Sequence, residues 1–317
     1  MFVTGCASRT PARTTAAASR ADVSELWVDP GNIRSRDLFH GAGGAALAPR
    51  ASARYDVLKV DDKGFSAGYD VRDREGTEWS VKLGPEAQSE VAASRILWAI
   101  GYHQPPTYLL SDWQLSGPRP IPASPARFRR EQPNEQVVSE WSWHDNPFVG
   151  TQPYRGLIVA NVMLNNWDWK TSNNKVYEVT GGRARRIYVV RDVGASLGKT
   201  SFPAFLRWTP FRFMAQGSRN DVDDFEGQQF IRSRRGDEVT FDYRGVHTGL
   251  VDMLTIADVE WTCRMLARLS DRQWDDAFRA AGYDRAIRER FVTHMKMKVQ
   301  QGLAAAKDPE FRAAASR

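Results

Sequence analysis

Alternating apolar and polar residues in the first half of the chain predict a small β-sheet. A turn is predicted at 73–76, where charged residues meet a glycine. The strands expected from this alternation are 55–60, 69–72, 79–83, 105–110, 114–115 and 137–143.

Apolar residues then recur with helical spacing. A helix is expected to follow Gly84, because Pro85 and Glu86 suit a helix start, and it would run to Ile100 and end at Gly101. Residues 151–164 carry enough apolar positions for a buried helix. Later helices are expected to begin at the capping pairs Thr255/Asp258 and Ser270/Gln273, a last one to carry Ile287, Phe291 and Met295, and the residues after Gly302 to fray.

Composition agrees with a globular protein that has a real core. Of the 317 residues, 42% are hydrophobic and 26% are charged. No apolar run approaches the roughly 20 residues that a transmembrane helix needs. The net charge of +6 suits phosphate-bearing ligands or an anionic surface, but no block of Lys and Arg is dense enough to predict nucleic-acid binding.

Several stretches are expected to carry no chemistry. Residues 119–136 form a polar, proline-bearing insertion, and the acidic run at 221–226 is interpreted as a solvated segment because it breaks the calcium-loop pattern. The aromatics of 202–213 are interpreted as packing anchors, and Cys263 as a small buried apolar residue. Trp141 and Trp143 are interpreted as core aromatics.

The segment after the predicted helix 151–164 carries the candidate chemistry. Asp168 is followed two residues later by Lys170 and five residues later by Asn173. This is the spacing of a phosphoryl-transfer centre, where a carboxylate orients the attacking hydroxyl and a lysine offsets charge on the transferring phosphate. The alternative is that Asp168 ends the helix and that Asn173 is an ordinary loop residue.

A second acidic position follows a predicted hairpin. The β-rich runs 175–179 and 186–190 flank turn glycines, and Asp192-Val193-Gly194 comes directly after them. Such a hairpin returns Asp192 to the side of Asn173, and together they offer the hard oxygen ligands that magnesium prefers. Alone, Asp192 would be a simple turn residue.

A third element is predicted in the small sheet. Lys82 ends a strand, and Glu90 lies on the apolar face of the following helix, where a carboxylate needs a partner. We expect the two to pair, with Glu86 as the alternative partner and a surface lysine as the simplest alternative. Gly64, Ser66 and Gly68 lie in a loop placed to cover phosphates, although the glycines also suit a plain hairpin.

These motifs together resemble the atypical kinases of the HipA and phosphatidylinositol-kinase-like kind. The resemblance implies a bilobal α+β fold, with a small antiparallel β lobe that carries one helix and a larger, mainly helical lobe. It implies an ATP- and Mg-dependent phosphotransferase in which Asp168 and Lys170 are catalytic, Asn173 and Asp192 bind metal, and Lys82 and Glu90 hold ATP. The expected divisions are a flexible segment at 1–54 and lobes at 55–145 and 146–317.

The resemblance is incomplete. Asn166-Trp167 stand where protein kinases have His-Arg, Val193 replaces a phenylalanine, and the glycine loop lacks its full pattern. The phosphate acceptor therefore stays open among proteins, lipids and small molecules. A nucleotide-binding pseudokinase without turnover is the alternative.

The start of the chain suggests a third interpretation. Residues 3–8, centred on Cys6, resemble a bacterial lipobox, but Met1-Phe2 supply no signal sequence before it. A true start farther upstream would complete a lipoprotein signal, and coincidence also explains the residues. The chain is accordingly expected in the cytoplasm, or tethered to a membrane if Cys6 is lipidated, and a tethered binding lipoprotein without catalysis is the remaining alternative.

Overall fold

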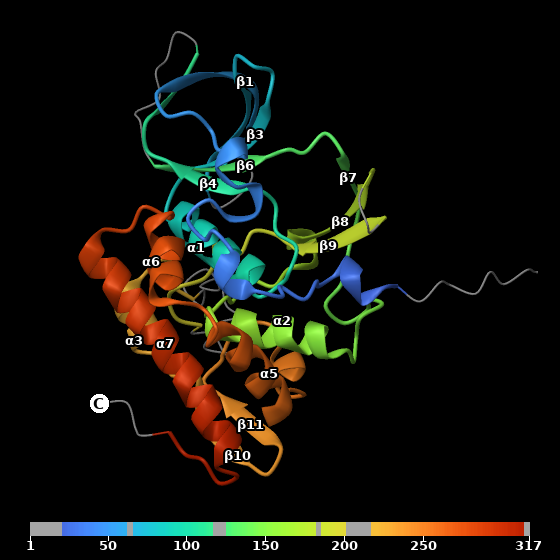
Figure 1. Ribbon diagram of the computed structural model, residues 1–317, viewed down its shortest axis with the longest axis vertical. Helices are drawn as coiled ribbons and strands as arrows, with labels where there is room; N and C mark the ends of the chain where they lie inside the picture. Colours follow the sequence, from blue (N-terminus) through green and yellow to red (C-terminus); the bar gives the residue numbers. More distant parts are fainter. Residues whose placement is uncertain (1–20, 62–65, 117–124, 182–184, 201–216, 314–317) are drawn as a thin grey trace, which may run out of the picture.

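The computed structural model describes residues 21–61, 66–116, 125–181, 185–200 and 217–313 (Figure 1). Cys6, Gly64 and the aromatic run 202–213 lie outside these residues. No helix of the described part is long and apolar enough to cross a membrane.

A six-stranded sheet forms the first lobe, with the order β4-β6-β3-β2-β1-β5. β4 and β5 stand at its two ends, yet only Ser111 and Asp112 separate them in the chain. A linker this short forces the sheet to curl until its ends approach each other. The strands are β1 (Ala53–Asp61), β2 (Gly68–Arg72), β3 (Glu78–Lys82), β4 (Thr107–Leu110), β5 (Trp113–Leu115) and β6 (Ala126–Arg130).

The inside of the curled sheet is an apolar core. Alternate residues of β3 and β6, among them Trp79, Val81 and Phe128, are buried there together with aromatics of the edge strands. All the strand pairs are antiparallel except that of β1 with β5, which is parallel. The residues between these positions face outward, toward the rest of the molecule.

Strand β6 corrects the expectation of an insertion at 119–136. Ala126-Arg-Phe-Arg-Arg has the composition of a surface loop, but it pairs with β3 on one side and with β4 on the other. Arg127 and Arg129 are buried because β3 and helix α1 (Glu86–Ala99) supply them with polar partners. An arginine-rich strand can occupy the middle of a sheet when its charges are paired in this way.

Helix α1 (Glu86–Ala99) packs on the outer face of this sheet, against β4 and β6. Nearly all of its residues are buried, and Gly101 takes the positive φ of 103° that ends it. The prediction of this helix is confirmed, with Pro85 as its N-cap.

The residues before the sheet are docked over more of their length than the predicted flexible segment allows. The 3₁₀ turns η1 (Val23–Glu25), η2 (Ile33–Ser35), η3 (Gly41–Gly43) and η4 (Ala45–Leu47) follow one another, and the side chains of Leu26, Ile33 and Leu38 are buried in the main core. The expectation of a tether with few docked pieces is therefore wrong for residues 21–48.

A second sheet links the two lobes. It has the order β7-β8-β9, formed by β7 (Glu135–Glu140), β8 (Asn174–Val179) and β9 (Arg186–Val190). The predicted hairpin is β8–β9, and the strand predicted at 137–143 ends earlier, at Glu140. Trp141 and Trp143 follow it into the core, as predicted.

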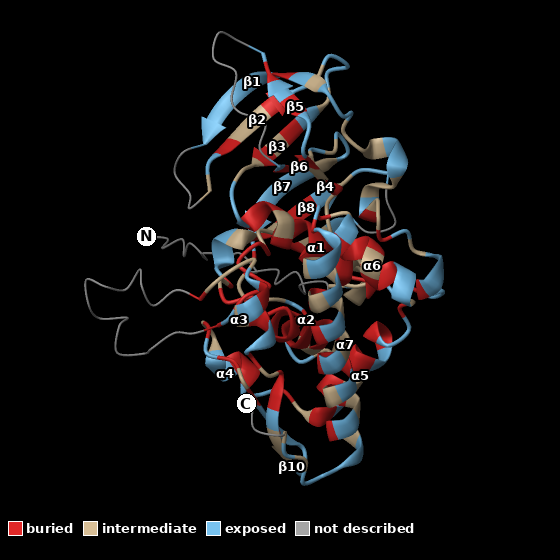
Figure 2. Cartoon of the chain, turned by 90° about the vertical axis from the view of Figure 1, so that its left-hand side faces the viewer, coloured by how far each residue is buried: buried red, intermediate tan, exposed pale blue. Residues whose placement is uncertain are grey.

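The larger lobe is mainly helical. Its longest helix, α7, lies beside α5 and α6 (Figure 1). Figure 2 shows that the buried residues follow α1 and α2 through the interior, whereas much of β1 is exposed. The helices are α2 (Gln152–Met163), α3 (Val222–Glu226), α4 (Thr248–Val251), α5 (Ile256–Leu266), α6 (Asp271–Arg279) and α7 (Arg285–Lys307), and η5 (Thr171–Asn173) is a 3₁₀ turn.

Two details of this lobe differ from the sequence analysis. Strands β10 (Ile231–Arg235) and β11 (Glu238–Phe241) form a hairpin. The sequence analysis did not predict it, because the residues of these strands are largely polar and basic. Helix α7 does not fray after Gly302, because this buried glycine lets the helix approach Cys263 closely. Both predicted capping boxes, at Thr255 and Ser270, are present.

The predicted fold class is confirmed: the chain is α+β and bilobal, with a small β lobe that carries one helix and a larger, mainly helical lobe.

Candidate functional site

Lys82, at the end of β3, joins three parts of the chain. Its Nζ lies 2.9 Å from Glu90 Oε2 on α1 and 3.1 Å from Asp192 Oδ1 after β9. The predicted Lys82–Glu90 pair is thus present, and Glu86, at 3.6 Å, is the more distant carboxylate. A single ammonium group therefore ties the sheet, the helix and the Asp-x-Gly segment together.

Glu90 is buried between two cations. Its Oε1 lies 3.1 Å from Arg127 Nε, while Oε2 faces Lys82. Burial opposes the ionisation of Glu90, but Arg127 and Lys82 outweigh it and lower the pKa of this carboxyl. Burial likewise disfavours the charged Lys82, and Glu90 and Asp192 outweigh burial, so that the pKa of Lys82 is raised. Both groups are held in their charged forms.

Asp192 is the carboxylate on which the cations of the cleft converge. Burial would raise its pKa, but Lys82, Arg129, Arg191 and Arg127 together hold the pKa of Asp192 well below its usual range. The residue has a φ of 53°, in the left-handed region that non-glycine residues rarely adopt. A strained aspartate that is kept ionised is typical of a functional position.

Gly194 brings the Asp-x-Gly segment against α1. A Cβ atom at this position would lie 2.8 Å from Glu86 Cβ and 2.9 Å from the Glu86 carbonyl oxygen. Ser89 Oγ donates a hydrogen bond of 2.6 Å to the Gly194 carbonyl oxygen. The glycine is required here because the two backbones approach each other closely.

The loop before η5 holds Asp168 by polar contacts with its own backbone. The Asn166 side chain accepts a hydrogen bond of 3.2 Å from the Asp168 N–H and donates one of 2.8 Å to Asn161 Oδ1. Asn173 Nδ2 donates to the Asp168 carbonyl oxygen at 3.0 Å. Asn166 and Asn161 are buried, so this part of the loop is fixed from below.

The Asp168 side chain remains partly exposed, with 20% of its surface accessible, and Lys170 Nζ lies 2.8 Å from its Oδ2. Lys170 itself is largely exposed. The structure therefore brings the two predicted catalytic residues together at the surface, where an incoming group can reach them.

The hairpin returns Asp192 to Asn173, as the sequence predicts. The Arg191 N–H donates a hydrogen bond of 2.9 Å to the Asn173 carbonyl oxygen, and Asn174 pairs with Val190 across β8 and β9. Since Asn173 also holds the Asp168 backbone, the three predicted residues form one connected unit.

The loop that was predicted to cover phosphates is described only in part. Gly64 lies outside the described residues. Gly68 lies in β2, paired with Lys82, and a Cβ atom there would be 3.0 Å from the Val81 carbonyl oxygen, which is a packing reason for glycine. Ser66 donates a hydrogen bond of 3.2 Å to Glu86 Oε2. Of the three residues, only Ser66 has a side chain placed toward the cluster around Lys82.

Sequence reasoning missed three arginines of this site. Arg127 and Arg129 come from β6, and Arg191 immediately precedes Asp192. The signal that was available is the alternation of Arg127 and Arg129 around Phe128, which puts both arginines on one face of a strand. The polar composition of the surrounding segment obscured it.

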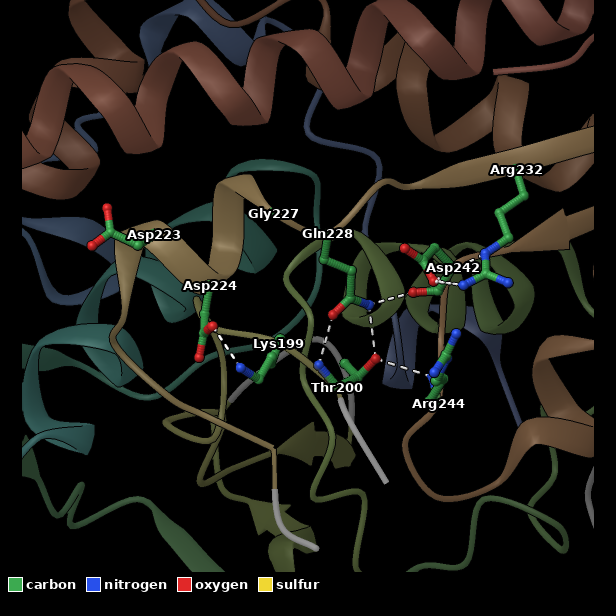
Figure 3. A pocket seen from close by; sticks show the side chains of 9 residues that line it. All are labelled: Lys199, Thr200, Asp223, Asp224, Gly227, Gln228, Arg232, Asp242 and Arg244. Atoms are coloured by element: carbon green, nitrogen blue, oxygen red, sulfur yellow. Dashed lines mark hydrogen bonds and ion pairs between the residues drawn. The ribbon is translucent and has the colours of Figure 1, made fainter. Parts of the chain in front are cut away.

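A hollow of about 240 Å³ lies in the larger lobe (Figure 3). Its side chains are bound to one another: Gln228 Nε2 donates to Thr200 Oγ1 at 2.7 Å, and Lys199 Nζ lies 2.7 Å from Asp224 Oδ1. The acidic run that was expected to be solvated is thus in part the short helix α3, held by ion pairs. These contacts brace the segment that follows Asp192.

The residues around Asp192 include donors of the kind that magnesium and a triphosphate need. Magnesium takes one or two carboxylates and completes its shell with water and phosphate oxygens. Asp192 and the amide of Asn173 fit this requirement. No cluster of three or more His, Cys, Asp or Glu side chains suited to a metal ion occurs in the described part of the chain. The cations around Asp192 fit a ligand with several negative charges.

No protein-family model matches the chain, and no curated protein matches it. Among solved structures, it is similar to the proinflammatory kinase CtkA of Helicobacter pylori, with a TM-score of 0.46 and 10% sequence identity over 81% of this chain and 98% of that one. No residue role follows from a likeness of this size. The elements described above give the chain a bilobal α+β fold.

Proposed function

We propose that the chain is an ATP- and Mg-dependent phosphotransferase of the atypical, HipA-like kind. The observation that carries the proposal is the position of Lys82, within 3.1 Å of both Glu90 and Asp192. A lysine held between a helix carboxylate and the carboxylate of an Asp-x-Gly segment is the arrangement that positions phosphates in kinases.

Each residue has a role in this proposal. Lys82 binds the phosphates and Glu90 keeps it in place. Asp192 and Asn173 hold magnesium, which, when bound, offsets charge on the phosphates. Asp168 orients an acceptor hydroxyl and takes its proton, and Lys170 offsets negative charge at the transferring group. Ser66 and the loop around it cover the phosphates, a role shared with Gly64 and Gly68.

The acceptor is a hydroxyl-bearing protein, lipid or small molecule. Asp168 and Lys170 are exposed enough to meet a large acceptor. A pseudokinase that binds nucleotide without turnover is the second candidate, because Asn166-Trp167 stand where protein kinases have His-Arg and Val193 replaces a phenylalanine.

Transfer from labelled ATP tests the proposal. With γ-labelled ATP and magnesium, the wild-type chain is expected to transfer or release the label, and both Asp168→Ala and Asp192→Ala to reduce the rate by at least about a hundredfold. Lys175→Ala is the control, since this surface lysine pairs with Glu140 in the second sheet.

A parallel reaction with α-labelled ATP separates phosphoryl from nucleotidyl transfer. Label on the acceptor from the α position would contradict phosphoryl transfer. ATP binding without any release would favour the pseudokinase.

If Cys6 lies in a lipobox of a longer precursor, the expressed precursor incorporates labelled lipid, and Cys6→Ala abolishes that incorporation.

A further inference from the structure

The face of β3 and β6 that packs against α1 carries basic and polar side chains. Lys82 is paired with Arg127 across the two strands, and Ser80 is paired with Arg129. These four residues share one face of the sheet, because side chains at alternate positions point the same way. The apolar side chains of the same strands, Val81 and Phe128, face the opposite side.

Arg129 is buried without a hydrogen-bonded carboxylate among the described residues. Its side chain is only 7% exposed, and the carboxylates of Asp192, Glu90 and Glu131 lie at 3.8 or 3.9 Å, beyond hydrogen-bond distance. Its Nε and Nη1 make no hydrogen bond to any residue of the described ranges. Its Nη2 donates a hydrogen bond of 3.1 Å to Ser80 Oγ.

The surroundings of Arg129 add charge of the same sign. Burial first, and then the nearby Arg191 and Arg127, lower the pKa of Arg129 to about 10. Arg191 donates one hydrogen bond to Tyr177 Oη at 2.8 Å, and its Nε makes none to the described residues. A guanidinium that is buried without full pairing is costly in the free protein, and an anionic ligand that completes its hydrogen bonds removes this cost.

Arg129 also lies near the connection between the lobes. Strand β6 runs from Ala126 to Arg130, and residues 131–134 then lead into β7. A flat aromatic base needs a pocket lined mainly by apolar side chains. Arg129, Ser80 and Arg191 offer polar and charged groups instead, which suit phosphate oxygens.

We propose that Arg129, with Lys82 and Arg127 beside it, binds phosphate, and that the site around these residues recognises a chain of phosphates while drawing little affinity from a base. The ligand class is a magnesium-bound polyphosphate, as a nucleoside triphosphate or as free tripolyphosphate. This inference depends on the proposed function only for the position of the ligand, which lies at the same site around Lys82 and Asp192.

Calorimetric titration tests this phosphate site without turnover. Wild-type protein with magnesium is titrated with ATP, tripolyphosphate and adenosine. We expect tripolyphosphate to bind within about tenfold of ATP, and adenosine to bind at least about a hundredfold more weakly. Adenosine binding within tenfold of ATP, or tripolyphosphate binding a hundredfold more weakly than ATP, would show a base pocket and overturn the inference.

Arg129→Met and Arg130→Gln form the matched pair of variants. Both remove one positive charge from β6, but Arg130 lies on the opposite face, over the Trp79 ring at 5.9 Å. Arg129→Met is expected to weaken ATP and tripolyphosphate alike by about tenfold to a hundredfold, and Arg130→Gln to leave both unchanged. Equal affinities in the two variants would contradict the proposal.

Thermal unfolding without ligand distinguishes a binding role of Arg129 from a structural role. Arg129→Met is expected to melt at or above the wild-type temperature, because it removes an incompletely paired buried charge. A melting temperature lowered by more than about 5 °C would assign Arg129 a structural role and overturn the proposal. Should Arg129→Met not fold, Arg129→Lys keeps the charge and loses the planar fork, and it is expected to weaken tripolyphosphate several-fold.

These outcomes are distinct from those of the transfer assay. A chain that binds tripolyphosphate through Arg129 but transfers no label keeps this inference and loses the proposed function. A chain that transfers label but binds adenosine as tightly as ATP keeps the proposed function and contradicts this inference.

Discussion

β3 and β6 are adjacent strands that present cations on the same face of the sheet, and these cations differ in how closely they are paired. Lys82 on β3 has two carboxylates within 3.1 Å, whereas the nearest carboxylate to Arg129 on β6 lies at 3.8 Å. Arg127, also on β6, is paired as closely as Lys82, because its Nε lies 3.1 Å from Glu90 Oε1. The comparison indicates that Lys82 and Arg127 hold the fold in position, and it supports the proposal that Arg129 meets an incoming anion.

Glu90 is the residue on which the pairing of Lys82 and Arg127 depends, and its loss should have the largest effect. Glu90→Gln leaves Lys82 and Arg127 buried with too little negative charge, so we expect the free energy of unfolding to fall by about 3–5 kcal/mol in a urea titration. Glu140→Gln is the control, because it removes a carboxylate from an exposed pair with Lys175 and should cost less than about 1 kcal/mol. Equal losses in the two variants would contradict the difference between buried and surface pairs.

Gly194 sets how closely Asp192 approaches α1, and both strands use that carboxylate. Gly194→Ala places a Cβ 2.8 Å from Glu86 Cβ, so we expect it to destabilise the fold by about 1–3 kcal/mol and to weaken binding of magnesium and ATP. Gly249→Ala, where an added Cβ has open space, serves as the control. Unchanged stability in Gly194→Ala would show that the segment moves freely.

The dependence of stability on pH tests the two carboxylates that pair with the buried cations, Asp192 and Glu90. The pKa values of Asp192 and Glu90 are lowered in the folded chain, so their contribution to stability is present above their unfolded values, near pH 4, and is lost as the pH falls below them. Between pH 5 and pH 3 we expect the wild type to lose about 1 kcal/mol more stability than Asp192→Asn does. A steeper loss in the variant would reverse the sign and contradict this assignment.

The Asp168–Lys170 pair should matter least for stability. Lys170 is largely exposed, so Lys170→Ala is expected to change the free energy of unfolding by less than about 0.5 kcal/mol. Its effect should instead appear in the rate of phosphate transfer, measured with the same protein. A fall in the free energy of unfolding of more than about 1 kcal/mol would show that Lys170 stabilises the fold.

The contrast between the two strands also explains what the sequence can and cannot predict. The strand that ends at Lys82 alternates regularly and precedes a well-formed helix start, so β3, α1 and the Lys82–Glu90 pair follow from local patterns. The hairpin β8–β9 places Asn173 beside Asp192 for the same reason, because its turn and strands are local.

Strand β6 does not follow from local patterns. Its arginines have partners on β3 and α1, more than thirty residues away, and no local pattern shows that those partners exist. Helix α7 is similar, since Gly302 looks like a helix end until it is known to pack against Cys263. The roles of the site residues and the lobe boundaries stay predictions, since they depend on a ligand and on how the lobes behave separately.

The most direct test of the central claim is the equilibrium binding of ATP with magnesium, because it needs no acceptor. We predict one site per chain that requires magnesium and weakens by at least about tenfold in both Lys82→Met and Asp192→Asn. Absence of binding, or the same affinity in the wild type and both variants, would contradict a nucleotide site built around Lys82 and Asp192.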